Sequence, residues 1–229
     1  MSALAGDLLP TTLRTLRVGF ESTAIAVGFG IPAGAALGLG RFRGRGPLLA
    51  VANAGIRMPP VAVGMALWLL MYPTSVWGGG PLSGLDWLYT TSAVILAQSL
   101  LALPIVIALT AAATQRVPND LLDQARAFGA GTFASALLAL REARIGVLAA
   151  VTAALGTALV SFGAVTIVGS SLGDATLATA ALVQWGAGGH DGQAAATGAV
   201  LIGMFLVIAA LLTALQQERG PATVVVRPG

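Results

Sequence analysis

Residues 119–146 read NDLLDQARAFGAGTFASALLALREARIG, a polar stretch set between strongly apolar segments. The pattern predicts two short helices that are joined at a glycine. Asn119 or Asp120 can cap the first helix, because a short acceptor side chain takes a free first-turn N–H. Gly129 can end that helix, since glycine adopts the left-handed conformation without strain. The pair is either a docking element or a hairpin that lies in the lipid headgroups.

The second of these helices is predicted to be amphipathic. Thr132 can cap it. One face at helical spacing then comprises Phe133, Ala136, Leu137, Leu140 and Ala143 or Arg144. A membrane protein that carries such a face between its apolar segments has a surface that a partner can cover.

The composition is typical of a membrane protein. Of the 229 residues, 56% are hydrophobic and 9% are charged, whereas soluble domains carry about a quarter charged residues. The apolar residues also cluster in runs close to membrane-spanning length. We therefore expect an all-α integral membrane protein with a single domain, residues 1–229. The absence of cysteine excludes disulfides and thiol chemistry, and the N-terminal residues lack the features of a secretory signal.

About five membrane-spanning helices are expected from the lengths of the apolar runs. Their predicted ranges are 18–40, 48–72, 93–113, 147–168 and 195–215, and a loop at 115–146 carries the polar stretch. Glycines recur every four residues in the first span, at Gly30, Gly34 and Gly38. This spacing predicts that the backbone of a neighbouring helix approaches closely there.

The placement of arginine predicts the orientation, because cytoplasmic loops are enriched in basic residues. Most arginines fall on the side of the 115–146 loop, namely Arg41, Arg43, Arg45, Arg116, Arg126, Arg141, Arg144, Arg219 and Arg227. Arg14 and Arg17 fall on the opposite side. The loop and the C-terminus are therefore expected in the cytoplasm, and the N-terminus is expected outside. In the alternative topology, residues 1–17 form a cytoplasmic surface helix.

The polar stretch resembles the EAA loop of ABC-importer permeases, whose pattern is Glu-Ala-Ala, three residues and Gly. Ala125 and Gly129 match this pattern, while Asp123 stands in place of Glu and Gln124 in place of Ala. The flanks are also similar: residues 127–130 look like the TLGA of the family, and residues 140–144 read LREAR, as in tungstate-type permeases.

Two further segments carry the same resemblance. One is similar to the N…PPVVVG segment of that subfamily and comprises Asn53, Pro59, Pro60, Val61, Val63 and Gly64. The other is similar to its EVGAVMMVGG segment and comprises Gly163, Ala164, Val165, Val168 and Gly169. Ser161 departs from the pattern, because oxyanion permeases usually carry Glu at this point. If that Glu helps to gate the path, this protein gates differently or carries another solute.

The chain is thus identified as a member of the tungstate, molybdate and sulfate type of permease. The resemblance implies the type I, MetI-like permease fold and a transport subunit rather than an enzyme. It also implies that the polar stretch is a coupling helix that docks on an ATPase. The residues carried over to this coupling loop are Asp123, Gln124, Ala125, Phe128, Gly129 and Ala130. The expected setting is a bacterial inner membrane.

The resemblance also implies the partners and the substrate. The partners are a second copy of the chain, two cytoplasmic ABC ATPases, an extracytoplasmic binding protein and membrane lipid, with no nucleic acid. The chain has no GxxxxGK[ST] phosphate loop, so ATP and Mg²⁺ are expected on the ATPase and no cofactor on this chain. Tungstate is the implied substrate, and molybdate, sulfate or another small solute are the alternatives. A lone histidine, His190, does not support a metal site and is expected to be a solvated loop residue.

A transport path is predicted at two points inside the spans. Pro59 and Pro60 delete two backbone donors, and broken helices of this kind line cavities, although a packing kink is the alternative. Arg57 places a costly charge inside a span, where it suits an anionic substrate or extends to the cytoplasmic interface. Ser161 and Gly163 complete the predicted path residues.

Two other functional classes fit the sequence poorly. An intramembrane hydrolase needs a nucleophile and a base at similar depth, yet the spans contain no histidine and the chain contains no lysine. A secondary transporter needs carboxylates within the membrane, and only Glu21 qualifies.

Overall fold

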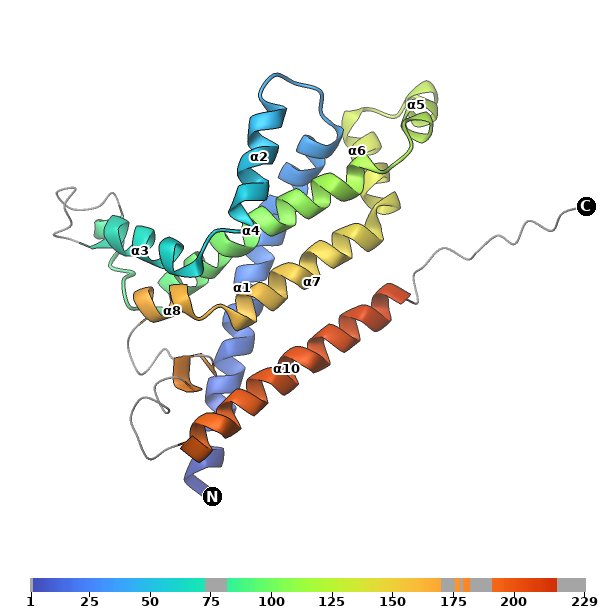
Figure 1. The fold of residues 1–229 in the computed structure, drawn as a ribbon. Coiled ribbons are helices and arrows are strands. Elements are labelled where there is room, and N and C mark those ends of the chain that lie inside the picture. Colours follow the sequence, from blue (N-terminus) through green and yellow to red (C-terminus); the bar gives the residue numbers. More distant parts are fainter. Residues whose placement is uncertain (1, 73–81, 170–175, 178, 182–190, 218–229) are drawn as a thin grey trace, which may run out of the picture.

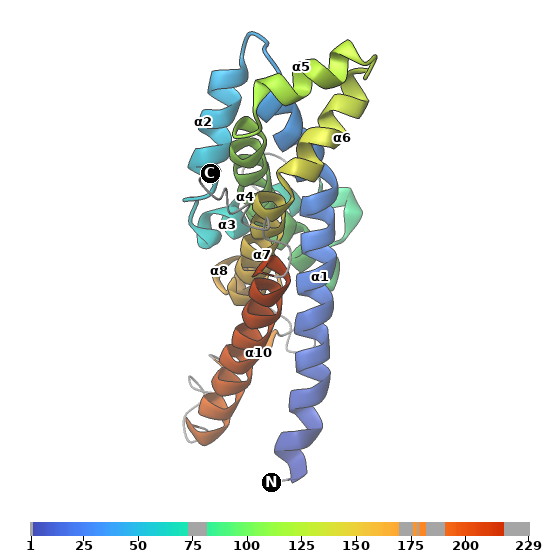
Figure 2. The same ribbon diagram turned by 90° about the vertical axis from the view of Figure 1, so that its right-hand side faces the viewer.

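The computed structural model describes residues 2–72, 82–169, 176–177, 179–181 and 191–217. The regular structure in these ranges is helical (Figure 1), and its elements are α1 (Ser2–Leu39), α2 (Arg45–Gly55), α3 (Pro60–Met71), η1 (Ser83–Leu85), α4 (Thr91–Gln115), α5 (Asn119–Ala127), α6 (Thr132–Glu142), α7 (Arg144–Val160), α8 (Gly163–Val168) and α10 (Asp191–Gln217). Two views at right angles place α5 and α6 at one end of an elongated bundle, while α1 begins at the opposite end (Figures 1 and 2).

The centre of the bundle is the crossing of α1 and α4. A Cβ on Gly30 would lie 2.7 Å from Cγ1 of Val106, and one on Gly34 would lie 2.7 Å from the carbonyl oxygen of Ile107. A Cβ on Gly38 would overlap the hydroxyl of Thr114. The close backbone approach predicted from the glycine spacing is therefore confirmed, and α4 is the neighbour.

The first helix is longer than predicted. It begins at Ser2 instead of about residue 18, and its 38 residues correspond to about 57 Å at 1.5 Å per residue. The hydroxyls of Thr12 and Thr15 bond to carbonyls one turn back, and Arg17 pairs with Glu21 at 2.7 Å. These local bonds accompany an unbroken helix, so residues 2–17 continue into the first span and do not form a separate segment.

The second predicted span, 48–72, is not continuous. It is divided into α2 and α3, whose axes differ by 105°. Pro59 has an extended backbone with ψ 129° and Pro60 begins α3, since neither proline can donate a helical hydrogen bond. Before the break, the N–H groups of Arg57 and Met58 turn to the carbonyls of Ala54 and Gly55. The predicted proline break is confirmed, and it is a change of direction rather than a slight kink.

The fourth predicted span, 147–168, is also divided, because α7 ends at Val160 and α8 begins at Gly163. The short halves after the two breaks, α3 and α8, pack on each other. A Cβ on Gly64 would lie 2.9 Å from Cα of Ala164, and one on Gly163 would lie 2.6 Å from Cγ2 of Val61. Glycine thus allows the two half-helices to meet backbone to backbone.

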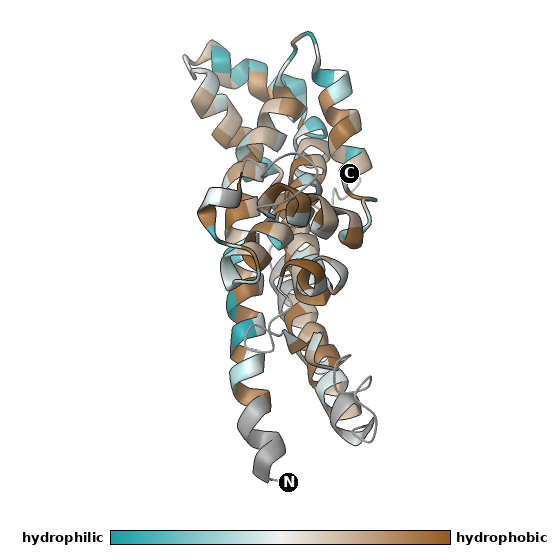
Figure 3. Ribbon diagram, turned by 90° about the vertical axis from the view of Figure 1, so that its left-hand side faces the viewer, coloured by the Kyte–Doolittle hydropathy of each residue, from teal (hydrophilic) through white to brown (hydrophobic). Residues whose placement is uncertain are grey.

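Among the described residues, two helices are individually long and apolar enough to cross a membrane, at Leu8–Leu39 and Thr91–Gln115, and α10 has an apolar part at Ala195–Ala210. Large apolar side chains are exposed along the bundle, among them Phe29, Val51 and Leu206. Hydrophilic residues gather at the end that carries α5 (Figure 3). This distribution fits a bundle in lipid with a polar end outside it.

Candidate functional site

The predicted helix pair at 119–146 is present as α5 and α6. The predicted caps are wrong, because Pro118 occupies the N-cap of α5 and Gly131 that of α6. Pro118 has φ −58° and ψ 131°, and Asn119 and Thr132 are already the first helical residues. Asp120 still lies in the first turn of α5, where its carboxylate is favourably placed toward the positive end of the helix dipole.

The end of α5 follows the prediction closely. Gly129 has φ +89°, and its N–H donates to the carbonyl of Arg126 at 2.9 Å. The N–H of Ala130 donates to the carbonyl of Ala125, also at 2.9 Å. These two bonds form the Schellman motif, which requires a left-handed residue at the position of Gly129.

The hairpin exposes two aromatic rings. Phe128 is 91% exposed and Phe133 is 83% exposed, and Leu137 on the next turn of α6 is exposed as well. The opposite side of α6 is buried through Ser135 and Ala139. Large apolar side chains therefore face outward while small ones hold the helix to the bundle, so the hairpin presents an uncovered contact surface.

The other residues of the predicted coupling loop surround this surface. Asp123 and Gln124 are exposed, and Asp123 pairs with Arg126 at 2.8 Å. Leu122 is buried in a small core with Val117, Ala139 and Ala143. One side of α5 is therefore anchored and the other remains free.

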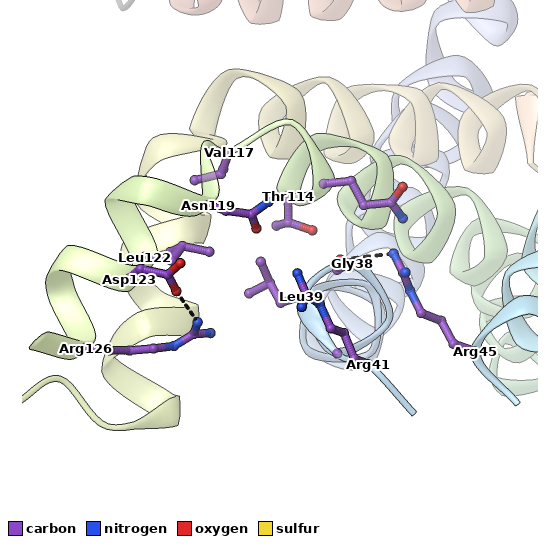
Figure 4. A pocket seen from close by; sticks show the side chains of 12 residues that line it. Gly38, Leu39, Arg41, Arg45, Thr114, Val117, Asn119, Leu122, Asp123 and Arg126 are labelled. Carbon is purple, nitrogen blue, oxygen red and sulfur yellow. Dashed lines mark hydrogen bonds and ion pairs between the residues drawn. The ribbon is translucent and has the colours of Figure 1, made fainter. Parts of the chain in front are cut away.

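A polar cavity of about 540 Å³ lies beside α5, between the ends of α1 and α4 (Figure 4). Its lining comprises Gly38, Leu39, Gly40, Arg41, Arg45, Thr114, Gln115, Val117, Asn119, Leu122, Asp123 and Arg126. From the sequence, Arg41 and Arg45 were expected only to mark the cytoplasmic side, and not to line a site. Both arginines directly follow the first apolar run, on the side where the polar stretch was expected. That position could have indicated that they lie near the polar stretch.

A second groove, of about 480 Å³, lies at the break between α2 and α3. Arg57, Pro59 and Pro60 line it together with apolar residues of α4 and with Ala153 and Thr157 of α7. Arg57 is exposed, and its guanidinium group forms no hydrogen bond or ion pair with any residue that the structure describes. The groove therefore combines mostly apolar walls with one uncompensated guanidinium group.

The remaining predicted path residues lie at the α7–α8 break. The Oγ atom of Ser161 is buried and has no hydrogen-bond partner among the described residues. Gly163 packs on Val61, the residue that follows Pro60. The fold thus brings the segments of the two breaks together, although Ser161 and Gly163 are not among the residues that line the groove of Arg57.

Within the described parts of the chain, no group of three or more His, Cys, Asp or Glu side chains is placed to hold a metal ion. His190 lies outside the described residues.

The geometry defines a class: helical membrane proteins with broken spans and a protruding helical hairpin at one end. The chain belongs to the family of binding-protein-dependent transport system inner membrane components, which matches residues 30–219. The predicted membership of the chain in the ABC-importer permeases is thereby confirmed.

Two relatives cover most of the chain. A probable anion ABC transporter permease protein of Haloferax volcanii is 35% identical over 211 residues, which are 89% of this chain and 88% of that protein. The tungstate uptake system permease protein TupB of Peptoclostridium acidaminophilum is 29% identical over 202 residues, 88% of this chain and 86% of that protein. The chain is accordingly a transport subunit and not an enzyme.

Solved structures show the same fold. An inward-facing form of the MetNI methionine ABC transporter matches with a TM-score of 0.75 and 19% identity, over 95% of this chain and 98% of that one. An amino acid ABC transporter matches with a TM-score of 0.66 and 17% identity, over 92% and 93%. The predicted MetI-like permease fold is confirmed.

Proposed function

We propose that this chain is the permease subunit of an ABC importer that moves an oxyanion, with tungstate as the first candidate. The observation that carries the proposal is its 35% identity, over 89% of its length, to a probable anion permease. The 29% identity to a tungstate uptake permease supports tungstate in particular. Molybdate and sulfate share the tetrahedral dianion chemistry and are the nearest alternatives.

ATP hydrolysis belongs to a partner in this proposal, because the chain has no phosphate loop. The α5–α6 hairpin is the surface on which that ATPase docks. Phe128 supplies the exposed apolar contact, and Asp123 and Gln124 supply polar groups beside it. Ala125, Gly129 and Ala130 hold the end of α5 in shape through the Schellman turn. ATP and Mg²⁺ reside on the ATPase, and this chain binds no cofactor.

The complete transporter contains two copies of this chain, two ATPases and an extracytoplasmic binding protein. The orientation places the hairpin and the C-terminus in the cytoplasm and the N-terminus outside, in a bacterial inner membrane. Arg41, Arg43 and Arg45 follow directly after the end of α1 at Leu39, and α1 ends on the side of the bundle that carries the hairpin (Figure 1). This placement supports the orientation, because basic residues favour the cytoplasmic side.

The anion path runs beside the two helix breaks. The guanidinium of Arg57 lines a mostly apolar groove without a partner among the described residues. A fixed cation in a low-dielectric wall attracts a divalent anion, and a single cation keeps the binding weak enough for release. Pro59 and Pro60 shape this groove, Ser161 offers a buried hydroxyl, and Gly163 lets the half-helices meet.

The alternative function, a secondary transporter, needs a membrane carboxylate that binds a proton or sodium ion. The one carboxylate that the sequence offered for this role is Glu21. Glu21 accepts a hydrogen bond from Arg17 at 2.7 Å, so its charge is already compensated.

Competitive uptake tests the substrate class. Cells that express the chain with its ATPase and binding protein are given tungstate, molybdate and sulfate in equal amounts, and intracellular metal and sulfur are measured by mass spectrometry. We expect preferential accumulation of one oxyanion, suppressed by excess of the others. Accumulation of none of the three above vector-only cells would contradict the proposed substrate class.

A further inference from the structure

We propose that the cavity beside α5 binds a tetrahedral oxyanion on the side of the bundle that carries the hairpin. The ligand is either the phosphate of an anionic phospholipid headgroup or a free inorganic oxyanion, since both present the same group to the protein. The cavity is separate from the groove of Arg57, and no lining residue is shared between them.

The lining carries an excess of positive charge. It contains the guanidinium groups of Arg41, Arg45 and Arg126 and the single carboxylate of Asp123. Planar guanidinium groups bind phosphate and related oxyanions in a fork geometry. One carboxylate leaves two of these cations uncompensated, so the cavity attracts an anion and repels a cation.

The three arginines differ in how they are held. Arg45 donates to the carbonyls of Leu37 and Gly38 at 2.7 and 3.2 Å, which fixes its side chain against the end of α1. Arg126 donates one N–H to Asp123. Because a guanidinium group has five N–H donors, Arg126 keeps donors for a ligand. Arg41 forms no hydrogen bond or ion pair with any described residue.

Figure 4 shows how these groups are arranged. Arg41 and Arg45 border the cavity from the end of α1 and the start of α2, while Asp123 and Arg126 border it from α5. Gln115 and Asn119 add exposed side-chain amides to the lining. A volume of about 540 Å³ accommodates a phosphate together with part of a lipid headgroup.

Binding here would link two parts of the chain. An anion held by both Arg41 and Arg126 bridges the end of α1 to α5, the helix whose outer surface carries Phe128. The ligand would therefore restrict the position of the hairpin relative to the bundle. Binding of the anion to this cavity does not require the transported substrate. It can therefore be measured on the chain without a transport assay.

The experiment uses the full-length chain in two arms. In the first arm, nanodiscs of neutral phosphatidylcholine are equilibrated with radiolabelled phosphate, and bound phosphate is measured by equilibrium dialysis. In the second arm, nanodiscs contain one part phosphatidylglycerol in ten, and lipid retained by the released protein is measured by native mass spectrometry. Saturable binding in the first arm identifies a free oxyanion, and selective retention in the second identifies a headgroup.

Three variants at two neighbouring arginines make the test specific. Arg41→Gln removes an exposed, unpartnered side chain of the cavity, so folding should be unaffected, and loss of a charge-assisted bond should weaken binding by roughly tenfold. Arg43→Gln removes the same charge from the same turn but outside the cavity lining, and it should change binding less than about twofold. Arg41→Lys should retain part of the affinity.

Absence of saturable binding in both arms would overturn the proposal. Equal losses in Arg41→Gln and Arg43→Gln would also overturn it, because they would indicate a general effect of surface charge.

Discussion

Replacing Gly129 by Leu tests whether the end of α5 couples the permease to its ATPase. Gly129 has φ +89°, and a Cβ there would meet nothing within 4 Å, so the cost is backbone strain and not a clash. An L-residue in this conformation costs about 1–2 kcal/mol. This energy lowers the ratio of intact to disrupted turn by roughly 5- to 30-fold. The bonds that weaken are those from Gly129 and Ala130 to Arg126 and Ala125.

The assay is substrate-stimulated ATP hydrolysis by the reconstituted transporter. We expect Gly129→Leu to lose most of the stimulation while the chain still inserts into the membrane, because Gly129 is exposed and follows α5, which lies at one end of the bundle (Figure 1). Gly129→Asn should keep more of the stimulation, since asparagine tolerates the left-handed conformation.

Gly44 provides the matched control. It has φ +96° and also faces open space, but it lies in the turn between α1 and α2. Gly44→Leu therefore imposes similar strain outside the hairpin and should leave the stimulation largely intact. Normal stimulation in Gly129→Leu, or an equal loss in Gly44→Leu, would refute the assignment of α5 as the coupling element.

Three further predictions concern packing, orientation and the path. Gly34→Leu should destabilise the chain by about 3 kcal/mol, because its Cβ would lie 2.7 Å from a backbone oxygen, whereas Gly28→Leu meets open space and should be nearly neutral in thermal unfolding. Gly84→Cys should react with an impermeant thiol reagent added to whole cells and Ala134→Cys should not. Both positions are exposed on the protein, so a difference in labelling reports the side of the membrane, and the reverse pattern would overturn the orientation. Arg57→Gln should slow anion uptake without loss of basal ATPase, and Arg57→Glu should slow it further; wild-type uptake in both would remove Arg57 from the path.

Local signals predicted several features correctly. The glycine at the end of α5, the four-residue glycine spacing of α1 and the Pro59-Pro60 break each depend on a backbone property of one residue type. Such properties act within a few residues, so sequence alone reveals them. The predicted caps were wrong in both helices, since Pro118 and Gly131 occupy the two N-cap positions and neither makes a side-chain capping bond.

Features that depend on tertiary packing were missed. The break at Ser161 has no proline, and the chain changes direction there where α8 packs on α3 through Gly163 and Gly64. The arginine cavity joins Arg41 to Arg126, which are distant in sequence and meet only because α5 folds back to the end of α1. The residues of α1 before Val18 were not predicted to belong to the first span, because their scattered polar side chains interrupt the apolar pattern.

The central claim is that this chain carries an oxyanion through the membrane at the expense of ATP hydrolysed by a partner. The most direct measurement is tungstate accumulation in proteoliposomes that contain the chain, its ATPase and its binding protein, with ATP enclosed on the ATPase side. We expect accumulation against the gradient that stops when the phosphate-loop lysine of the ATPase is replaced by alanine. Accumulation that continues with this inactive ATPase, driven by a proton or sodium gradient instead, would contradict it.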